Sequence, residues 1–536
     1  MAFTNRESFL AKNKFIGLFA NKYFILSFIL AIGVFLRLYH LTGKSLWYDE
    51  ACSLSFTGYN WKDLLDHRYM TRPLYFVILK IWVGLFGSSE FMARFLSVGF
   101  GIAAIILVYK LVKLLYGKNT GLLSAFLISI SPYHIYYAQQ VRNYTLFLCL
   151  GLISMIIFIM LLDNEKSTLY VLYLITNGLM VCTHPFGVYV ILTQVLYFLI
   201  ISKKAKYKIN FLITQTLLVF FSLLFLMWLN KRVGNSINNE IAYITTPNFK
   251  SLLETFEVFS YGGYRQAHGG IGFQTGANRL LIPRILTVFF SCLLFFLLLP
   301  NKKNQSTNSA KLSCRNKDLF FFLWLFLPIG ITYLFSIIIR PIYLNRYFFV
   351  TSVAFYVIIA KAITLLPNIK VRILSILLVV ILTINSLGIL YNPGSSADWK
   401  QVVRYAISNI KQGDVIMLVP IMQIVPFWYY YKYGARLNLA NIDKFGKKIN
   451  NKWNVEFLNG DHLVSGFAPD MNNDYIESRI TDFRARKNNI CLVISPHWVG
   501  SDFYQAIISA LNSYYILERS QYFAYSGVEV DFYALR

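Results

Sequence analysis

The sequence predicts a polytopic α-helical membrane protein over residues 1–392, followed by a small α/β domain over residues 393–536. The chain is 56% hydrophobic and 17% aromatic, and its mean hydropathy is +0.51. Many of its apolar stretches reach about 18 residues, a length that spans a bilayer. Beyond residue 392 the hydropathy falls, and short β-like runs alternate with amphipathic stretches. Together these observations indicate an integral membrane protein with a soluble C-terminal part.

A net charge of +26 would by itself suggest a nucleic-acid-binding protein, but the positions of the basic residues along the chain do not support this. Residues 393–536 carry 15 Lys and Arg against 13 Asp and Glu, whereas residues 1–392 carry 36 against 12. The basic residues of the first part lie mostly in short loops, which is the positive-inside pattern with affinity for anionic headgroups. The six cysteines are scattered and suggest neither a disulfide framework nor metal-ligand spacing. We therefore expect membrane lipids as partners and no nucleic acid.

The apolar runs predict about eleven spans. They lie near residues 23–41, 95–115, 120–138, 143–162, 168–184, 186–202, 209–229, 280–299, 319–339, 347–366 and 373–391. The run 73–87 is short for a crossing, and if it does not cross, the basic loops all share the side of the N-terminus. We therefore predict that it is an interfacial or re-entrant helix. The N-terminus is then cytoplasmic, while the loop 42–72 and the C-terminal domain lie outside the cell's inner (plasma) membrane.

A linker is predicted at residues 392–396, which read Asn-Pro-Gly-Ser-Ser. The segments after it predict the small α/β domain. The expected strands are Val415–Val419, Ile490–Ile494 and Val528–Ala534, and the expected amphipathic helices are Trp399–Ile410 and Phe503–Tyr514.

Asp49 and Glu50 form an adjacent pair of acids just beyond the first apolar run. Acidic side chains near a bilayer are costly, which favours a functional role. A solvated loop or a helix N-cap would also explain them. The functional alternative is a general base, with or without metal contact, and like charges side by side raise the proton affinity of one member.

Several other polar residues are candidates for binding. Arg142, Arg340 and Arg346 lie on the expected outer side, against the positive-inside trend, so an anion such as phosphate is a natural ligand. Arg72 fits either a lipid headgroup or a specific ligand. His184, between Thr183 and Pro185, is more often structural at such a position.

The ordered set of these motifs resembles the polytopic glycosyltransferases of family 39, which include the protein O-mannosyltransferases and the lipid A aminoarabinose transferase. The matching segments are Leu36-Arg37-Leu38, Ser45-Leu46-Trp47-Tyr48-Asp49-Glu50-Ala51, Arg72-Pro73-Leu74-Tyr75, Ser89-Glu90-Phe91-Met92-Ala93-Arg94, Ser131-Pro132-Tyr133-His134-Ile135-Tyr136-Tyr137, Arg142-Asn143-Tyr144, Thr183-His184, Arg340-Pro341 and Arg346-Tyr347.

The resemblance implies a GT-C architecture and transfer of a sugar from a polyprenyl phosphate at the outer face. Asp49 resembles the family's first-loop catalytic carboxylate, with Glu50 beside it, and Arg142 and Arg346 would lie near the lipid phosphate. The remaining residues expected to bind substrate are Arg72, Tyr75, Gln140, Tyr144, His184 and Arg340.

Two positions depart from the family pattern. Thr71 and Gln140 replace an imidazole and a carboxylate that many bacterial relatives carry. Neutral amide and hydroxyl oxygens hold divalent cations less well than carboxylates do, so a metal-dependent mechanism is in doubt. No cofactor is certain, and a divalent metal ion stays an alternative.

The expected activity is an inverting transfer from the polyprenyl-phosphate-linked sugar to an acceptor hydroxyl or amine on a glycan, lipid or protein of the cell envelope. Two alternatives remain. A transporter or flippase would carry polar residues mid-span and inverted repeats. A non-catalytic protein would bind lipid-linked sugar without transferring it.

Overall fold

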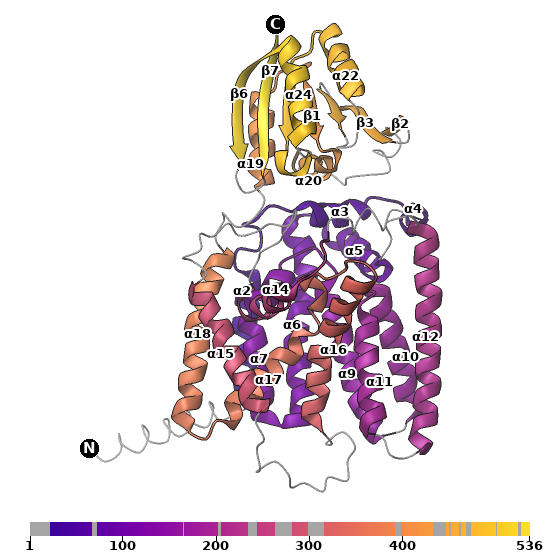
Figure 1. Cartoon of the computed structure of the whole chain (residues 1–536), viewed down its shortest axis with the longest axis vertical. Helices are drawn as coiled ribbons and strands as arrows, with labels where there is room; N and C mark the ends of the chain where they lie inside the picture. Colours follow the sequence, from indigo (N-terminus) through magenta and orange to yellow (C-terminus); the bar gives the residue numbers. More distant parts are fainter. Residues whose placement is uncertain are drawn as a thin grey trace, which may run out of the picture.

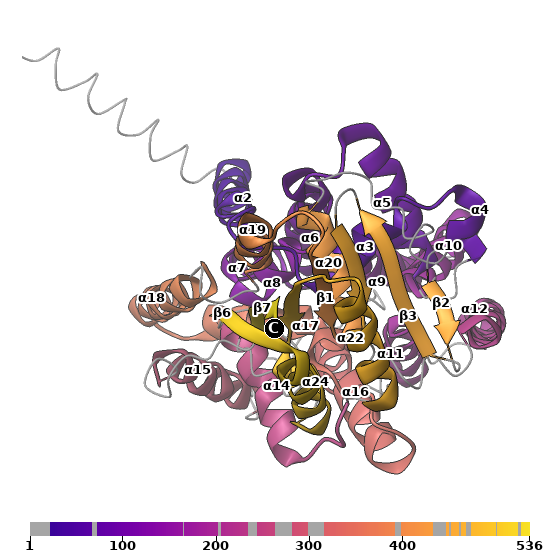
Figure 2. The ribbon, with the colours of Figure 1, turned by 90° about the horizontal axis from the view of Figure 1, so that it is seen from above.

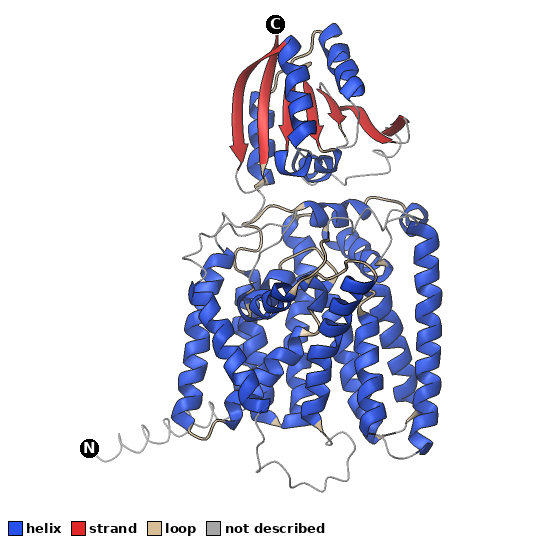
Figure 3. Ribbon diagram, in the orientation of Figure 1, coloured by secondary structure: helices blue, strands red, loops and turns tan. Residues whose placement is uncertain are grey.

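The computed structural model describes residues 22–536 except for 67–71, 165, 202–204, 234–243, 263–280, 299–315, 392–397, 432–445, 450–451, 460–461, 468–472, 500 and 524–526. A bundle of helices forms one end of the molecule, and a sheet flanked by helices forms the other (Figures 1 and 3). Thr71, the whole linker 392–396 and the predicted boundary at residue 392 lie outside the described residues.

Each apolar run that was predicted to span the membrane contains a helix. The helices of this part are α2 (Lys22–Leu38), α3 (Tyr48–Phe56), α4 (Trp61–Asp66), α5 (Pro73–Phe86), α6 (Glu90–Tyr116), α7 (Lys118–Ile130), α8 (Pro132–Ala138), α9 (Tyr144–Asp163), α10 (Ser167–Thr183), α11 (Gly187–Ile201), α12 (Ala205–Val233), α14 (Phe249–Tyr261), α15 (Leu281–Leu298), α16 (Lys317–Ile338), the 3-10 helix η4 (Asn345–Phe348), α17 (Ser352–Leu365) and α18 (Ile369–Tyr391). Among the described residues, five helical segments are long and apolar enough to cross a membrane: Glu90–Tyr116, Tyr144–Asp163, Ile209–Trp228, Lys317–Ile338 and Ile369–Tyr391.

The apolar run 120–138 is two helices, not the single span that its composition predicts. Pro132 has no backbone N–H and disfavours a helical residue before it, so α7 stops at Ile130. Ser131 then caps α8, because its hydroxyl accepts a hydrogen bond from the N–H of His134 at 3.3 Å.

Helix α5 is too short to cross a bilayer alone, since 14 residues span about 21 Å. It begins at Pro73 and ends at Phe86, and the residue that follows, Gly87, has a φ of +88°, which favours glycine. Its buried side, formed by Tyr75, Phe76, Leu79 and Val83, belongs to an apolar cluster shared with α3 and α6. Helices α3, α4 and α5 lie at the end of the bundle that faces the C-terminal domain (Figure 1).

Arg37 is almost fully buried near the end of α2 and stabilises the C-terminus of α7. Its guanidinium donates to the carbonyls of Ser129 at 2.9 Å, Ile128 at 3.2 Å and Gly33 at 3.1 Å. The first two are among the last carbonyls of α7, which have no partner within that helix. A cation at a helix C-terminus is also favoured by the helix dipole.

The C-terminal domain is built on one seven-stranded mixed sheet with the order β2-β3-β4-β1-β5-β7-β6. β1 is parallel to β4 and β5, and the other pairs are antiparallel. The strands are β1 (Val415–Val419), β2 (Gly446–Ile449), β3 (Lys452–Asn459), β4 (His462–Gly466), β5 (Ile490–Ile494), β6 (Tyr515–Phe523) and β7 (Val528–Leu535). The helices are α19 (Trp399–Asn409), α20 (Ile424–Tyr431), α22 (Asn473–Ala485), α23 (Pro496–Val499) and α24 (Ser501–Tyr514), with the 3-10 helix η6 (Ile421–Gln423).

The two faces of this sheet pack differently. Val415, Met417 and Val419 face an apolar cluster with α22 and α24. Ile416 and Leu418 belong instead to the cluster that contains α19, α20 and the α3–α5–α6 surface of the bundle. The C-terminal domain and the end of the bundle therefore share one apolar core. Seen from above, the domain lies over the bundle (Figure 2).

We predict that replacing Arg37 with Met destabilises the fold. The carbonyls of Ile128 and Ser129 would lose their donor, and each buried group left without a partner costs about 1–3 kcal/mol. The measurement is the temperature of half-unfolding in detergent. Lys370→Met, at an exposed position at the start of α18, is the control and should leave that temperature unchanged. An equal shift in both variants would contradict the capping role.

Candidate active site

Asp49 and Glu50 occupy the first turn of α3, where acids are favoured by the helix dipole. Consecutive helical residues point about 100° apart, so the two carboxylates face different surroundings. The side chain of Glu50 is 1% exposed and that of Asp49 is 24% exposed. The pair therefore divides into one buried and one accessible acid.

Glu50 forms a buried ion pair with Arg94 of α6. Its Oε1 accepts from Arg94 Nε at 2.9 Å, and its Oε2 accepts from Nη2 at 2.8 Å. Arg94 also donates to the carbonyls of Leu41 at 2.7 Å, Lys44 at 2.8 Å and Ser45 at 3.1 Å. These bonds use all five guanidinium donors, and they hold the 41–46 loop against α6.

Glu50 also connects α3 to the loop that carries Arg142. Its Oε1 accepts from the N–H of Val141 at 2.9 Å, and its Oε2 accepts from the N–H of Trp47 at 3.4 Å. Because Val141 precedes Arg142 in the chain, this contact brings the Arg142 loop to α3. Glu50 and Arg94 thus form a frame that sets Asp49 opposite Arg142.

Asp49 is held by arginines. Its Oδ2 lies 3.2 Å from Arg142 Nη2 and 3.8 Å from Arg346 Nη1. Burial would raise the pKa of Asp49, but Arg142, Arg346 and Arg72 outweigh it and leave the pKa below its usual value. The expected rise in proton affinity from the adjacent acid therefore does not occur at Asp49. This carboxylate is ionised across the neutral range.

The three arginines come from distant segments. Arg72 precedes α5, Arg142 lies between α8 and α9, and Arg346 lies in η4. Burial and the neighbouring Arg142 lower the pKa of Arg72, and Arg72 Nε has no hydrogen-bond partner among the described residues. With Asp49 ionised, the cluster has an excess of two positive charges, which suits an anionic ligand.

His184 completes the cluster as a neutral group. Burial first, and then the three arginines, hold its pKa well below its usual value. Its Nδ1 accepts from the N–H of Phe186 at 3.2 Å, so Nε2 carries the proton. Within the described part of the chain, this buried Nε2–H has no acceptor. The site therefore includes an uncharged donor beside three cations.

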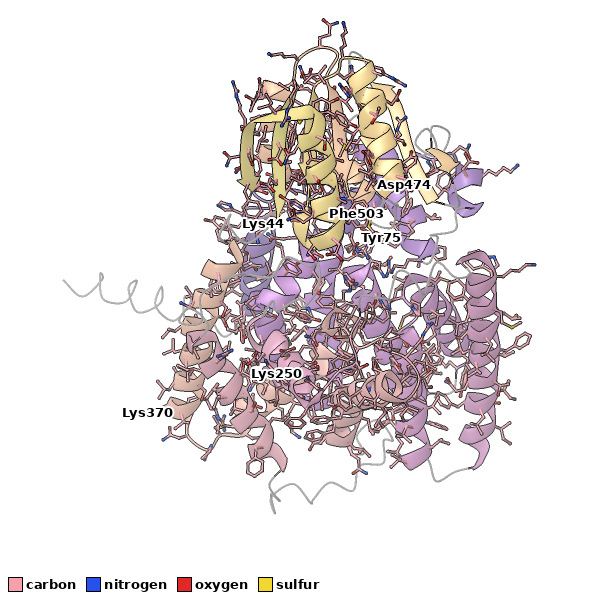
Figure 4. All side chains as sticks on the ribbon, turned by 45° about the horizontal axis from the view of Figure 1, so that its top comes forward. Lys44, Tyr75, Lys250, Lys370, Asp474 and Phe503 are labelled. Carbon is pink, nitrogen blue, oxygen red and sulfur yellow. The ribbon has the colours of Figure 1, made fainter. Side chains whose placement is uncertain are left out.

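Aromatic rings surround these groups. Arg142 lies over Tyr144 and Arg346 over Tyr347, at 5.9 and 5.6 Å from the ring centres. Tyr347 also packs edge-on against His184. Tyr75 is buried on α5 and lies where the bundle meets the C-terminal domain (Figure 4).

Two further predicted binding residues lie outside the set of groups around Asp49 described above. Gln140 is buried in the turn just before Arg142, and its backbone carbonyl accepts from the N–H of Arg142 at 2.8 Å, whereas Arg340 is exposed just beyond the end of α16. The role of Arg94, by contrast, was not foreseen. Its spacing of four from Glu90, at the start of a long apolar helix, is a signal that could have indicated it, because charges there require partners.

The described residues do not fit a divalent cation. They contain no group of three or more His, Cys, Asp and Glu side chains able to hold one. Asp49 faces guanidinium groups, and both oxygens of Glu50 are occupied by Arg94. A cation at Asp49 would have to compete with three positive charges, so no step is assigned to a metal here.

Comparisons with known proteins give a family match over part of the chain and several solved structures with the same fold. Residues 71–228 match the family model of dolichyl-phosphate-mannose-protein mannosyltransferase. No curated protein sequence matches the chain. The fold resembles apo ArnT from Cupriavidus metallidurans, with a TM-score of 0.56 at 12% identity over 94% of this chain and 97% of ArnT.

Two ligand-bound structures also share the fold. One is the same ArnT bound to undecaprenyl phosphate, with a TM-score of 0.53 at 13% identity over 95% of this chain and 97% of ArnT. The other is the oligosaccharyltransferase AglB from Archaeoglobus fulgidus in complex with an inhibitory peptide and a dolichol-phosphate. Its TM-score is 0.51 at 13% identity over 93% of this chain and 73% of AglB.

The protein is thus a multi-pass membrane protein with the GT-C fold. Residues 71–228 match the mannosyltransferase family model, and the chain as a whole shares the fold of these solved structures.

We predict that Glu50→Gln destabilises the protein strongly, because Arg94 would be left buried without its counter-charge. Breaking such a pair typically costs about 3–5 kcal/mol. Chemical denaturation followed by tryptophan fluorescence measures the loss. Glu518→Gln, on the exposed strand β6, makes the same chemical change and should have little effect. Equal stability of the two variants would contradict the frame role of Glu50.

Proposed function

We propose that the protein transfers a sugar from a polyprenyl-phosphate donor to an acceptor hydroxyl or amine, with inversion, at the outer face of the membrane. The observation that carries this proposal is one carboxylate, Asp49, held among Arg72, Arg142 and Arg346. Such a site contains a base and the counter-charges for a phosphate leaving group.

Charge balance favours a phosphate-linked donor. A sugar phosphodiester carries one negative charge, and the released phosphate monoester carries close to two at neutral pH. The net charge of +2 in the cluster around Asp49 therefore balances the charge of the released phosphate monoester better than the single charge of the phosphodiester donor. Because charge grows on the phosphate as the bond breaks, fixed cations stabilise the transition state more than the ground state.

The reaction proceeds as a single displacement. The oxygen or nitrogen of the acceptor forms a bond to the anomeric carbon of the sugar. As this bond forms, the carboxylate of Asp49 takes the proton from that oxygen or nitrogen. The bond from that carbon to the phosphate oxygen breaks, and its electron pair leaves with the polyprenyl phosphate. Arg142 and Arg346 bind the phosphate, and the Nε2–H of His184 donates to it.

Donor binding also activates the base. In the free protein, Arg142 and Arg346 stabilise ionised Asp49 and so make it a weak base. When these guanidinium groups turn to the phosphate, Asp49 loses part of that stabilisation and its proton affinity rises. Glu50 is assigned a positioning role, because its oxygens are occupied by Arg94 and backbone N–H groups.

The proposed orientation follows the charges on α6. Glu90 and Arg94 lie at its start near the site, whereas Lys110 and Lys113 lie near its end, about 30 to 35 Å further along this helix of 27 residues. Lys370 likewise lies towards the far end of the bundle (Figure 4). The positive-inside rule puts that end in the cytoplasm, with the N-terminus, and makes the C-terminal domain extracytoplasmic. The membrane is the inner, plasma membrane.

Asp49→Asn should reduce sugar transfer by about 10²–10⁴-fold, which is the usual contribution of a positioned base. The assay uses the full chain in liposomes with labelled polyprenyl-phosphate sugars, mannose included, and envelope glycan, lipid and protein acceptors. Binding of undecaprenyl phosphate should persist or tighten, because a competing negative charge is removed. The control is Asp63→Asn, at an exposed position in α4 of the same outer loop. Full sugar transfer by the Asp49→Asn variant would contradict the proposal. If the wild-type protein transfers no sugar, a sugar-binding protein or a transporter would be favoured instead.

The pH profile provides a second test. A lowered pKa keeps the Asp49 carboxylate ionised at every pH above its ordinary value of about 3.9, and the lowered pKa of His184 keeps that ring neutral above about 6.5. The kcat/KM of the free enzyme should therefore be level from about pH 6.5 to 8. An acid limb centred near pH 6.5 would show that a histidine titrates instead.

A further inference from the structure

The segment at the start of α6 has contacts that the proposed chemistry does not use. Glu90, one turn before Arg94, is bound from the C-terminal domain. Its Oε2 lies 2.6 Å from Lys400 Nζ, and its Oε1 accepts the hydroxyl proton of Tyr430. The domain that lies over the bundle is therefore tied to the helix that carries Arg94.

The same two residues also bind the loop that leads into α3. The hydroxyl of Tyr430 accepts from the N–H of Leu46 at 2.5 Å. Lys400 donates through its backbone N–H to Ser45 Oγ at 3.1 Å and through Nζ to the carbonyl of Thr42 at 2.8 Å. Each residue thus joins the start of α6 to the 41–46 loop.

This loop is consequently held from two sides. Arg94 binds its carbonyls at Leu41, Lys44 and Ser45, while Lys400 and Tyr430 bind it from the C-terminal domain. The loop runs directly into Trp47, the N-cap of α3, and Asp49 follows two residues later. A shift of the loop would therefore move Asp49 relative to the arginines that come from other segments.

The apolar contacts follow the same route. Leu46 and Ala51 share one buried cluster with Ile424 and Phe427 of α20 and with Trp399 of α19. In Figure 2, α20 lies beside α3. The polar contacts therefore lie at the edge of a packed joint, where water competes less for hydrogen bonds.

We propose that Tyr430 and Lys400 are positioning residues, through which docking of the C-terminal domain sets the place of Asp49. The role in transfer depends on the proposed function, but the effect on the 41–56 segment does not. A displacement of about 1 Å in a reacting group can reduce a rate by about 10²-fold, so a modest loosening of this contact is enough to matter.

Tyr430→Phe tests the proposal, because it removes the hydroxyl and keeps the ring. We expect kcat to fall about ten-fold, while KM for the donor and the affinity for undecaprenyl phosphate stay within about two-fold. Peptides over residues 46–56 should exchange backbone hydrogens about five- to ten-fold faster, as loss of one hydrogen bond permits. The control is Tyr429→Phe, which removes a hydroxyl bonded to the carbonyl of Ser88 instead, and it should change neither quantity.

A double-mutant cycle with Glu90→Gln tests whether the contacts act as one unit. If they do, Tyr430→Phe adds little to the kcat loss of Glu90→Gln, and the effects are not additive. Independent, additive losses would overturn the proposal, as would unchanged exchange over 46–56 in Tyr430→Phe. If the wild type transfers no sugar at all, the proposed function fails, and the exchange result alone decides the positioning role.

Discussion

The buried ion pair between Glu50 and Arg94 is the constraint on which the site depends. Taking two charges out of water is costly, and such a pair is tolerated only when its remaining hydrogen-bonding groups are satisfied. Here Arg94 uses all five donors, and both Glu50 oxygens accept two bonds each. The pair therefore joins α3, α6, the 41–46 loop and the Arg142 loop in one arrangement. Removing either partner would leave a charge that none of these segments could compensate.

The chemistry follows from what this frame leaves exposed. With Glu50 occupied, Asp49 is the accessible acid, and it faces Arg142 and Arg346. A carboxylate stabilised in this way is a poor base until its cations find another anion. In the proposed reaction, phosphate binding would therefore raise the base strength of Asp49, and proton abstraction would be restrained before a donor is bound.

The bundle and the C-terminal domain are not independent in this fold. One apolar cluster spans both, and Glu90 receives polar contacts from Lys400 and Tyr430 at its edge. The loop before α3 would otherwise be a connection of low local stability, as loops on a membrane protein surface often are. Contacts from two sides hold this loop in place, as the proposed positioning of Asp49 requires.

The sequence by itself determined the membrane class and the positions of the long apolar helices, apart from the break at Pro132, and it supplied the candidate residues as predictions. Apolar length and charge bias are local properties, so they can be read directly, as can the strands at 415–419 and 490–494, which are continuous buried runs. Strands β2, β3, β4 and β6 were missed. Their sequences are mixed in polarity, and β6 is exposed along most of its length, so it lacks the alternation that predicts a half-buried strand.

Only the tertiary structure decided what the adjacent acids do. Asp49 and Glu50 look equivalent in the sequence, but the helical turn of about 100° between them sends one to Arg94 and the other to Arg142 and Arg346. The sequence positions of Arg72, Arg142 and Arg346 do not reveal that the three side chains come together around Asp49. That convergence depends on helix packing and on the frame made by Glu50 and Arg94, because the partners of a buried charge are chosen in space and not along the chain.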